Sequence, residues 1–162
     1  MAKYTLHSDF NVFDFVLIGI SSSENQYVIV NQINHSLKIN LSLEQNLKTT
    51  SKDNSLFEFS IFNYIDEELG LDYYLVPNRS NYKPQNIIVE NYDLFAESKQ
   101  IIEQSSLLIS ELPHTNYFII LKGISAIHEQ YNVFKLLKEI EVIDQVHEVI
   151  PEKLPSKNNL IF

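Results

Sequence analysis

The residue types that most often do chemistry in proteins are present in this chain, but their spacing builds no familiar catalytic motif. Metal sites usually carry their ligands in local pairs such as His-x-His or His-x-x-x-His. The five histidines form no such pair, because they stand far apart at His7, His35, His114, His128 and His147. We interpret them as surface or half-buried histidines, and the sequence predicts no metal site.

Nucleophilic chemistry is equally poorly supported. Gly19-Ile20-Ser21 resembles the start of a nucleophile elbow, but that motif needs a second glycine where Ser23 stands. Ser21 fits the N-cap of a helix instead, with Glu24 completing a capping box. The chain has no cysteine, which excludes a thiolate nucleophile, a zinc ribbon and an iron–sulfur cluster. The sequence therefore predicts no catalytic residue and no cofactor site.

Charged side chains supply two weaker candidates. The acidic groupings at residues 66–68 and 139–144 would form a cation or acid–base site only if their carboxylates converged in a cleft. A solvated turn and a helix end explain them as well. Arg79 is the only arginine, and it could clamp a carboxylate or pair with a neighbouring surface acid. We retain Arg79 as a candidate interaction residue.

Composition indicates one acidic globular domain. The 162 residues suit a single hydrophobic core. With 21 acidic and 12 basic residues, the formal charge of −9 disfavours nucleic acid and anionic membrane surfaces as partners. The apolar runs are too short to cross a membrane, and the first residues lack the pattern of a signal peptide. We therefore expect a cytoplasmic protein.

Hydrophobic periodicity predicts the elements that would position these residues. Helical spacing predicts helices over 22–37, 92–103 and 128–140, the last with Tyr131 and Phe134 in its buried stripe. Residues 44–55 are polar and without periodicity, which predicts a mobile loop. Alternation and short apolar runs predict strands over 13–20, 39–43, 57–62, 71–76, 87–89, 117–121 and 142–150. The strands over 57–62 and 71–76 are predicted to form a hairpin.

These elements predict an α+β fold, with a mainly antiparallel sheet of five to seven strands and two or three helices packed on one face. The last strand–helix–strand segment makes the prediction partly ferredoxin-like. We expect residues 1–150 to form a single α+β domain and residues 151–162 an extended C-terminal tail, because Pro151 and Pro155 favour an extended path.

The tail ends in three hydrophobic residues that need to be buried somewhere, Leu160, Ile161 and Phe162. One alternative is that they dock in the protein's own core. The other is that they insert into a second chain or into the groove of a partner. The three residues are therefore candidate interaction residues.

A further motif precedes the predicted strand over 117–121, in the stretch Ile109-Ser110-Glu111-Leu112-Pro113-His114-Thr115-Asn116-Tyr117. With Phe118-Ile119-Ile120, this stretch resembles the signature of the uncharacterised bacterial IPExxxVDY family. Three positions match its Ile, Glu and Tyr, and three depart from its Pro, Val and Asp: Ile109, Glu111 and Tyr117 match, whereas Ser110, Thr115 and Asn116 depart. Residues 15–21 and 151–162 are similar to that family's start and terminus.

The resemblance implies no activity, because none is established for the family. An aspartate at position 116 could act as a base, whereas the amide of Asn116 cannot. We therefore interpret Ile109, Glu111, Asn116 and Tyr117 as a structural motif, a turn in which the Asn116 side chain bonds the turn backbone and supports the following strand.

Three functions stay open. The sequence favours a non-enzymatic protein-binding or adaptor domain that acts on a protein partner or by self-association as a homodimer. The alternative is a small-molecule-sensing regulatory domain, by analogy with ferredoxin-like pairs, and its ligand is unknown. The third is an enzyme without a recognisable motif. A broad exposed apolar patch would favour the first, and a pocket with converging polar groups the second.

Overall fold

Seven strands, two α-helices and two short 3-10 helices make up the part of the chain that the structure, a computed structural model, describes: residues 15–50, 56–82 and 105–162. In chain order they are β1 (Phe15–Ser21), α1 (Gln26–Leu37), β2 (Ser42–Thr50), β3 (Leu56–Asp66), β4 (Leu71–Pro77), β5 (Asn81–Tyr82), β6 (Tyr117–Gly123), α2 (Ala126–Lys138), β7 (Gln145–Val149), η1 (Pro151–Lys153) and η2 (Lys157–Leu160).

The strands form one antiparallel sheet. Six follow the order β2-β3-β4-β6-β1-β7, and the short β5 pairs with β3. Strands β6 and β7 flank β1 and are joined through α2, which gives the split β-α-β arrangement expected for the end of the chain. The predicted α+β fold with a mainly antiparallel sheet is confirmed.

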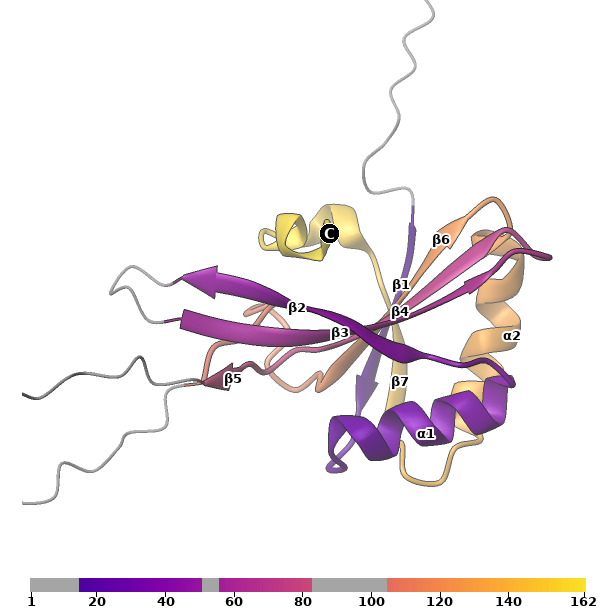
Figure 1. The fold of residues 1–162 in the computed structure, drawn as a ribbon, viewed down its shortest axis with the longest axis horizontal. Helices are drawn as coiled ribbons and strands as arrows, with labels where there is room; N and C mark the ends of the chain where they lie inside the picture. Colours follow the sequence, from indigo (N-terminus) through magenta and orange to yellow (C-terminus); the bar gives the residue numbers. More distant parts are fainter. Residues whose placement is uncertain (1–14, 51–55, 83–104) are drawn as a thin grey trace, which may run out of the picture.

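The sheet buries a different side-chain set on each face, because alternate residues of a strand point to opposite sides. In β6, Tyr117, Ile119 and Leu121 point towards the helices, and Phe118 and Ile120 point away from them. Both helices lie on the same face, as predicted (Figure 1). We call the hydrophobic cluster between this face and the helices the helix-side core; its helical members include Ile29, Val30, Ile33, Ala126, Val133 and Leu137.

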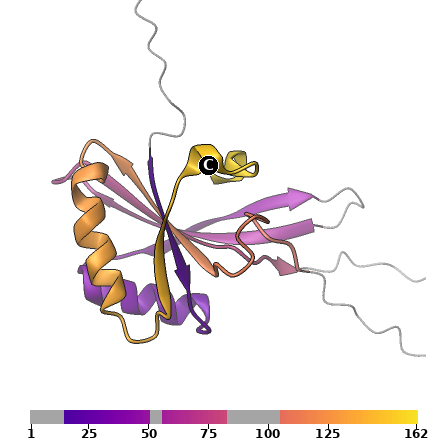
Figure 2. The same cartoon turned by 180° about the vertical axis from the view of Figure 1, so that it is seen from behind.

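No α-helix of the described chain covers the opposite face. The 3-10 segments at the end of the chain and the segment before β6 lie over it instead (Figures 1 and 2). We call the second cluster, which these segments complete, the tail-side core: Phe15, Leu17, Phe57, Phe59, Ile61, Val76, Leu108, Ile109, Phe118, Ile120, Leu154 and Leu160.

Helix α1 begins later than predicted, and Ser21 is not its cap. Strand β1 continues through Ser21, which pairs with Gln145, so the chain cannot turn into a helix there. Asn25 is the N-cap, and its Oδ1 accepts hydrogen bonds from the amides of Tyr27 at 3.0 Å and Val28 at 3.2 Å.

The predicted loop over 44–55 is wrong for residues 44–50, which belong to β2. Strand β2 forms the free edge of the sheet next to β3, and most of its side chains are exposed. A strand exposed on both faces carries no hydrophobic alternation, so its sequence resembles that of a loop. The strand predicted over 39–43 begins only at Ser42.

The C-terminal half needs smaller corrections. Helix α2 starts at Ala126 and buries Val133 and Leu137, while Tyr131 lies outside the buried stripe. The last strand starts at Gln145 rather than at 142, because Ile140 and Ile143 turn into the helix-side core first. The elements predicted over 87–89 and 92–103 lie outside the described residues. Within the described chain, neither helix has the length and apolar composition needed to cross a bilayer.

Candidate functional site

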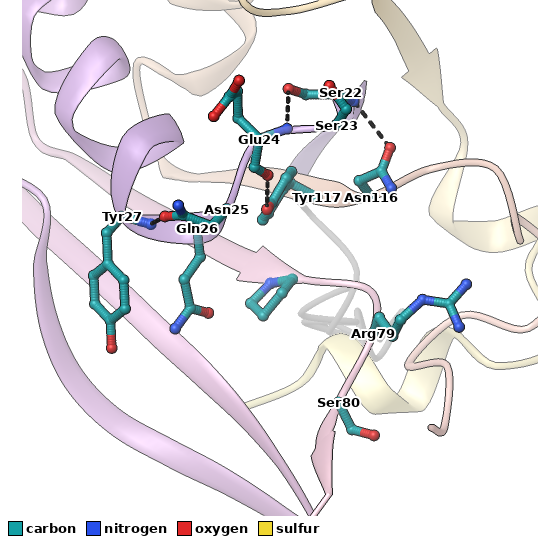
Figure 3. Close-up of a pocket in the computed structure, with 11 residues that line it drawn as sticks. Ser22, Ser23, Glu24, Asn25, Gln26, Tyr27, Arg79, Ser80, Asn116 and Tyr117 are labelled. Atoms are coloured by element: carbon teal, nitrogen blue, oxygen red, sulfur yellow. Dashed lines mark hydrogen bonds between the residues drawn. The ribbon is translucent and has the colours of Figure 1, made fainter. Parts of the chain in front are cut away.

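A polar cleft of about 530 Å³ lies beside the start of α1 (Figure 3). It is lined by residues 22–27 of the β1–α1 connection, by Pro77, Arg79 and Ser80 after β4, and by Asn116 and Tyr117 at the start of β6. These segments meet because β4 and β6 are neighbours in the sheet, with Pro77 opposite Tyr117. The cleft therefore brings together three predicted candidates that stand apart in the sequence: Arg79, Asn116 and Tyr117.

Two side chains fix the β1–α1 connection, which forms one wall of the cleft. The Oδ1 of Asn116 accepts a hydrogen bond from the amide of Ser22 at 2.9 Å, and the hydroxyl of Tyr117 donates to the carbonyl of Glu24 at 2.5 Å. Burial, with a smaller effect of the Glu24 charge, raises the pKa of Tyr117. Tyr117 is therefore a neutral hydrogen-bond donor rather than a base.

Three further polar side chains of the cleft already have hydrogen-bond partners. The Ser22 hydroxyl donates to the carbonyl of Val142 at 2.6 Å, and the Ser80 hydroxyl accepts from the amide of Ser106 at 2.9 Å. Arg79 is exposed, and its Nη1 donates to the Ser105 hydroxyl at 2.8 Å. The cleft thus offers hydrogen-bonding groups and one charge of each sign, from Arg79 and Glu24.

Replacing Asn116 by alanine is expected to lower the free energy of unfolding by about 0.5–1.5 kcal/mol, because the Ser22 amide loses its acceptor. Asn116→Asp keeps an acceptor oxygen at the same place and should stay within about 0.5 kcal/mol of the parent protein. Urea denaturation of the three proteins checks both values. Equal losses in the two variants, or no loss in the alanine variant, would contradict this role for the side chain.

The turn before β6 is held by a residue that the sequence analysis did not single out. Asn78 is fully buried, and its Nδ2 donates to the carbonyls of Ile109 at 3.3 Å, Leu112 at 2.9 Å and Thr115 at 2.9 Å. Its Oδ1 accepts from the amide of Ile109 at 2.8 Å. The expectation that Asn116 bonds the turn backbone is corrected accordingly, since Asn116 reaches across to Ser22. No local sequence pattern indicates this role of Asn78, because its hydrogen-bond partners lie more than thirty residues away.

The other motif residues connect the turn to the end of the chain. Ile109 is fully buried in the tail-side core. Glu111 accepts hydrogen bonds from the Ser156 amide at 2.6 Å and from the Ser110 hydroxyl at 3.0 Å. Partial burial acts to raise the pKa of Glu111, but these hydrogen bonds outweigh it and leave the pKa below its usual value. Glu111 therefore fastens the tail as a carboxylate.

The end of the chain is folded rather than extended, which corrects the prediction for residues 151–162. Pro151 starts η1, where its fixed φ is compatible with a helical turn. Leu160 is fully buried in the tail-side core, so this side chain docks in the protein's own core, which was the first of the two alternatives. Phe162 packs beside Tyr74, with 5.7 Å between ring centroids, and Ile161 remains 44% exposed.

A second feature, on the opposite side of α2 from its buried stripe, is apolar. Tyr131, Ile127 and Ile124 are 78%, 72% and 91% exposed, and Leu69 in the β3–β4 turn is 41% exposed. The Ser125 hydroxyl donates to the carbonyl of Leu69 at 2.6 Å, which fixes that turn beside the start of α2. We call these four side chains the α2 surface. The sequence analysis assigned Tyr131 to the buried stripe and started the helix at 128, after Ile127, so it did not find this surface.

Comparisons with family models, with curated proteins and with solved structures found no match to this chain. The resemblance to the IPExxxVDY family therefore stays a prediction.

Proposed function

We propose that this chain is a non-enzymatic protein-binding domain that acts in the cytoplasm and docks its partner on the α2 surface. The observation that carries the proposal is the exposure of three large apolar side chains, Ile124 just before α2 and Ile127 and Tyr131 on it, between 72% and 91% of each. Single exposed hydrophobic residues are ordinary, but a contiguous group of them marks an interaction site. Tyrosine in particular is enriched in protein interfaces.

The rigidity of α2 supports the proposal. Ala126, Val133 and Leu137 are buried in the helix-side core and hold the helix against the sheet. Ile127 and Tyr131 are therefore presented by a packed helix and do not need to be ordered on binding. A preorganised apolar surface loses less entropy on association than a mobile one does.

The test is a photoreactive phenylalanine analogue placed at Tyr131 in the full-length protein and irradiated inside cells. We expect one covalent adduct of discrete mass. The matched control carries the same analogue at Asn46, an exposed position on β2, and should give no such adduct. No adduct from position 131, or the same adducts from both positions, would contradict the proposal.

The polar cleft supports a second candidate, a small-molecule-sensing domain. Its volume of about 530 Å³ is in the range of small-ligand sites. Arg79 could bind a carboxylate on the ligand, and Glu24 a positively charged group, so the fitting chemical class is a small zwitterion or carboxylate. A thermal-shift screen of such compounds should find one that stabilises the parent protein but not Arg79→Ala. No stabilising compound, or equal stabilisation of both proteins, would contradict this candidate.

A further inference from the structure

We infer that the partner of the α2 surface is a second copy of this chain, packed with its α2 antiparallel to the first across a twofold axis at Tyr131. The inference rests on the proposed function and names the partner for it. A twofold interface uses the same patch on both copies, so the patch must complement itself. Helix α2 and the turn beside it meet this condition in both shape and charge.

The first argument is the register of the helix around Tyr131. Ile127 lies four residues before Tyr131, and Lys135 lies four residues after it; Ile124 and Lys138 lie seven residues before and after. Ile127, Tyr131, Lys135 and Lys138 share one side of the helix, because positions separated by three, four and seven residues lie close to one line; Ile124 lies in the turn just before α2. With Tyr131 on the axis, the exposed Ile127 of one copy faces the exposed Lys135 of the other. The aliphatic stem of a lysine can cover such a side chain while its ammonium group stays in water.

The second argument is charge. The turn beside the start of α2 carries the exposed Glu67 and Glu68, and the exposed Glu152 borders a groove that Ile124 and Ile127 also line. On the side of the helix that carries Tyr131, the last turn presents Lys135 and Lys138, and the exposed Glu139 and Glu141 follow the helix. Antiparallel packing therefore places Glu67 and Glu68 of each copy beside Lys135 and Lys138 of the other.

This separation of charge also decides between possible occupants. The chain has a formal charge of −9, so two copies repel each other at long range unless their contact is locally complementary. A uniformly basic or acidic partner would match one end of the surface and be repelled by the other. A second copy matches both ends at once, and complementary charges of this kind set the orientation of an interface.

Sedimentation velocity over a concentration series tests the inference on the full chain. We expect the parent protein to show a monomer–dimer equilibrium. Ile127→Glu should lower the association constant roughly 10-fold to 100-fold without changing the melting temperature, because Ile127 is exposed. The control Asn46→Glu adds the same charge on β2 and should associate like the parent. A parent protein that stays monomeric, or an Ile127→Glu protein that dimerises like the parent, would overturn the inference.

A charge exchange tests the antiparallel orientation. One variant carries Glu67→Lys and Glu68→Lys, and the other carries Lys135→Glu and Lys138→Glu. Each variant alone places like charges at both ends of the dimer and should be largely monomeric. A mixture of the two restores opposite charges at both ends and should associate about as well as the parent. A mixture that associates no better than its components would overturn the arrangement.

The in-cell adduct at position 131 separates this inference from the proposed function. An adduct of twice the 18.9 kDa chain mass supports both. An adduct to a different protein, with a monomeric parent, overturns self-association and leaves the docking surface in place. A monomeric parent with no adduct overturns both.

Discussion

Replacing Asn78 by leucine is expected to lower the free energy of unfolding by about 3–5 kcal/mol. Leucine has nearly the same shape as asparagine but neither of its polar groups. The variant leaves the carbonyls of Ile109, Leu112 and Thr115 without their shared donor and the amide of Ile109 without its acceptor. The carbonyls of Ile109 and Leu112 keep a second donor, from the amides of Leu112 and Thr115. The main cost, about 1–3 kcal/mol for each group, therefore falls on the Thr115 carbonyl and the Ile109 amide.

Urea denaturation followed by circular dichroism measures this effect. The matched control is Asn46→Leu, the same change at an exposed position on β2, which should shift stability by no more than about 0.5 kcal/mol. Asn78→Asp is a second, polar test: it keeps an oxygen for the Ile109 amide but turns the donor into an anion that faces three carbonyls, so it should also be strongly destabilised. If the leucine variant at position 78 were as stable as the control, the turn before β6 would not depend on this side chain.

The parts of the fold that could be predicted are those in which local pattern and final environment agree. Residues 57–62 alternate because Phe57, Phe59 and Ile61 face the tail-side core between polar neighbours. Residues 71–76 alternate because Leu71, Tyr73 and Leu75 face the helix-side core, and the two strands pair as β3 and β4. Strand β2 could not be predicted in the same way. It lies at the edge with most of its side chains in solvent, and neither face imposes a period on the sequence.

The start of α1 was predicted wrongly for a different reason. Three serines precede Asn25, and each has the chemistry of an N-cap. What chooses between them is the length of β1, which runs to Ser21 because Gln145 of β7 pairs with it there. That pairing joins residues more than a hundred positions apart, so no local pattern can reveal it.

Residues of the candidate cleft could be selected from the sequence, but their arrangement in space could not. Arg79 was chosen for its chemistry, and Asn116 and Tyr117 for their motif, but their meeting in one cleft depends on the pairing of β4 with β6. The α2 surface was missed because the predicted helix began only at residue 128 and because α2 carries two apolar stripes. Val133 and Leu137 on one stripe are buried, whereas Ile127 and Tyr131 on the other are exposed. Periodicity alone cannot decide which of two stripes faces a core.

The second large loss of stability is expected at the end of the chain, where the buried Leu160 and the exposed Ile161 are neighbours. Leu160→Ala is expected to lower the free energy of unfolding by about 2–5 kcal/mol, because the side chain is fully buried in the tail-side core and its removal leaves a cavity there. Ile161→Ala is the matched control. Ile161 is 44% exposed and lies outside both cores, so the same kind of truncation should cost less than about 1 kcal/mol.

Measuring the Leu160→Ala protein and the parent at several concentrations also shows whether the tail docks in its own chain or in another. Docking in the same chain predicts that the effect of Leu160→Ala on the melting temperature is independent of protein concentration. It also predicts that the mass in solution equals that of the parent at each concentration. The tail is held there by further contacts, from the Asn159 amide group to the Leu108 carbonyl at 2.7 Å and from the Ser156 amide to Glu111 at 2.6 Å. An effect that grows on dilution, accompanied by loss of a dimer, would show instead that Leu160 is buried in a partner; equal costs for the two variants would show that neither side chain anchors the tail.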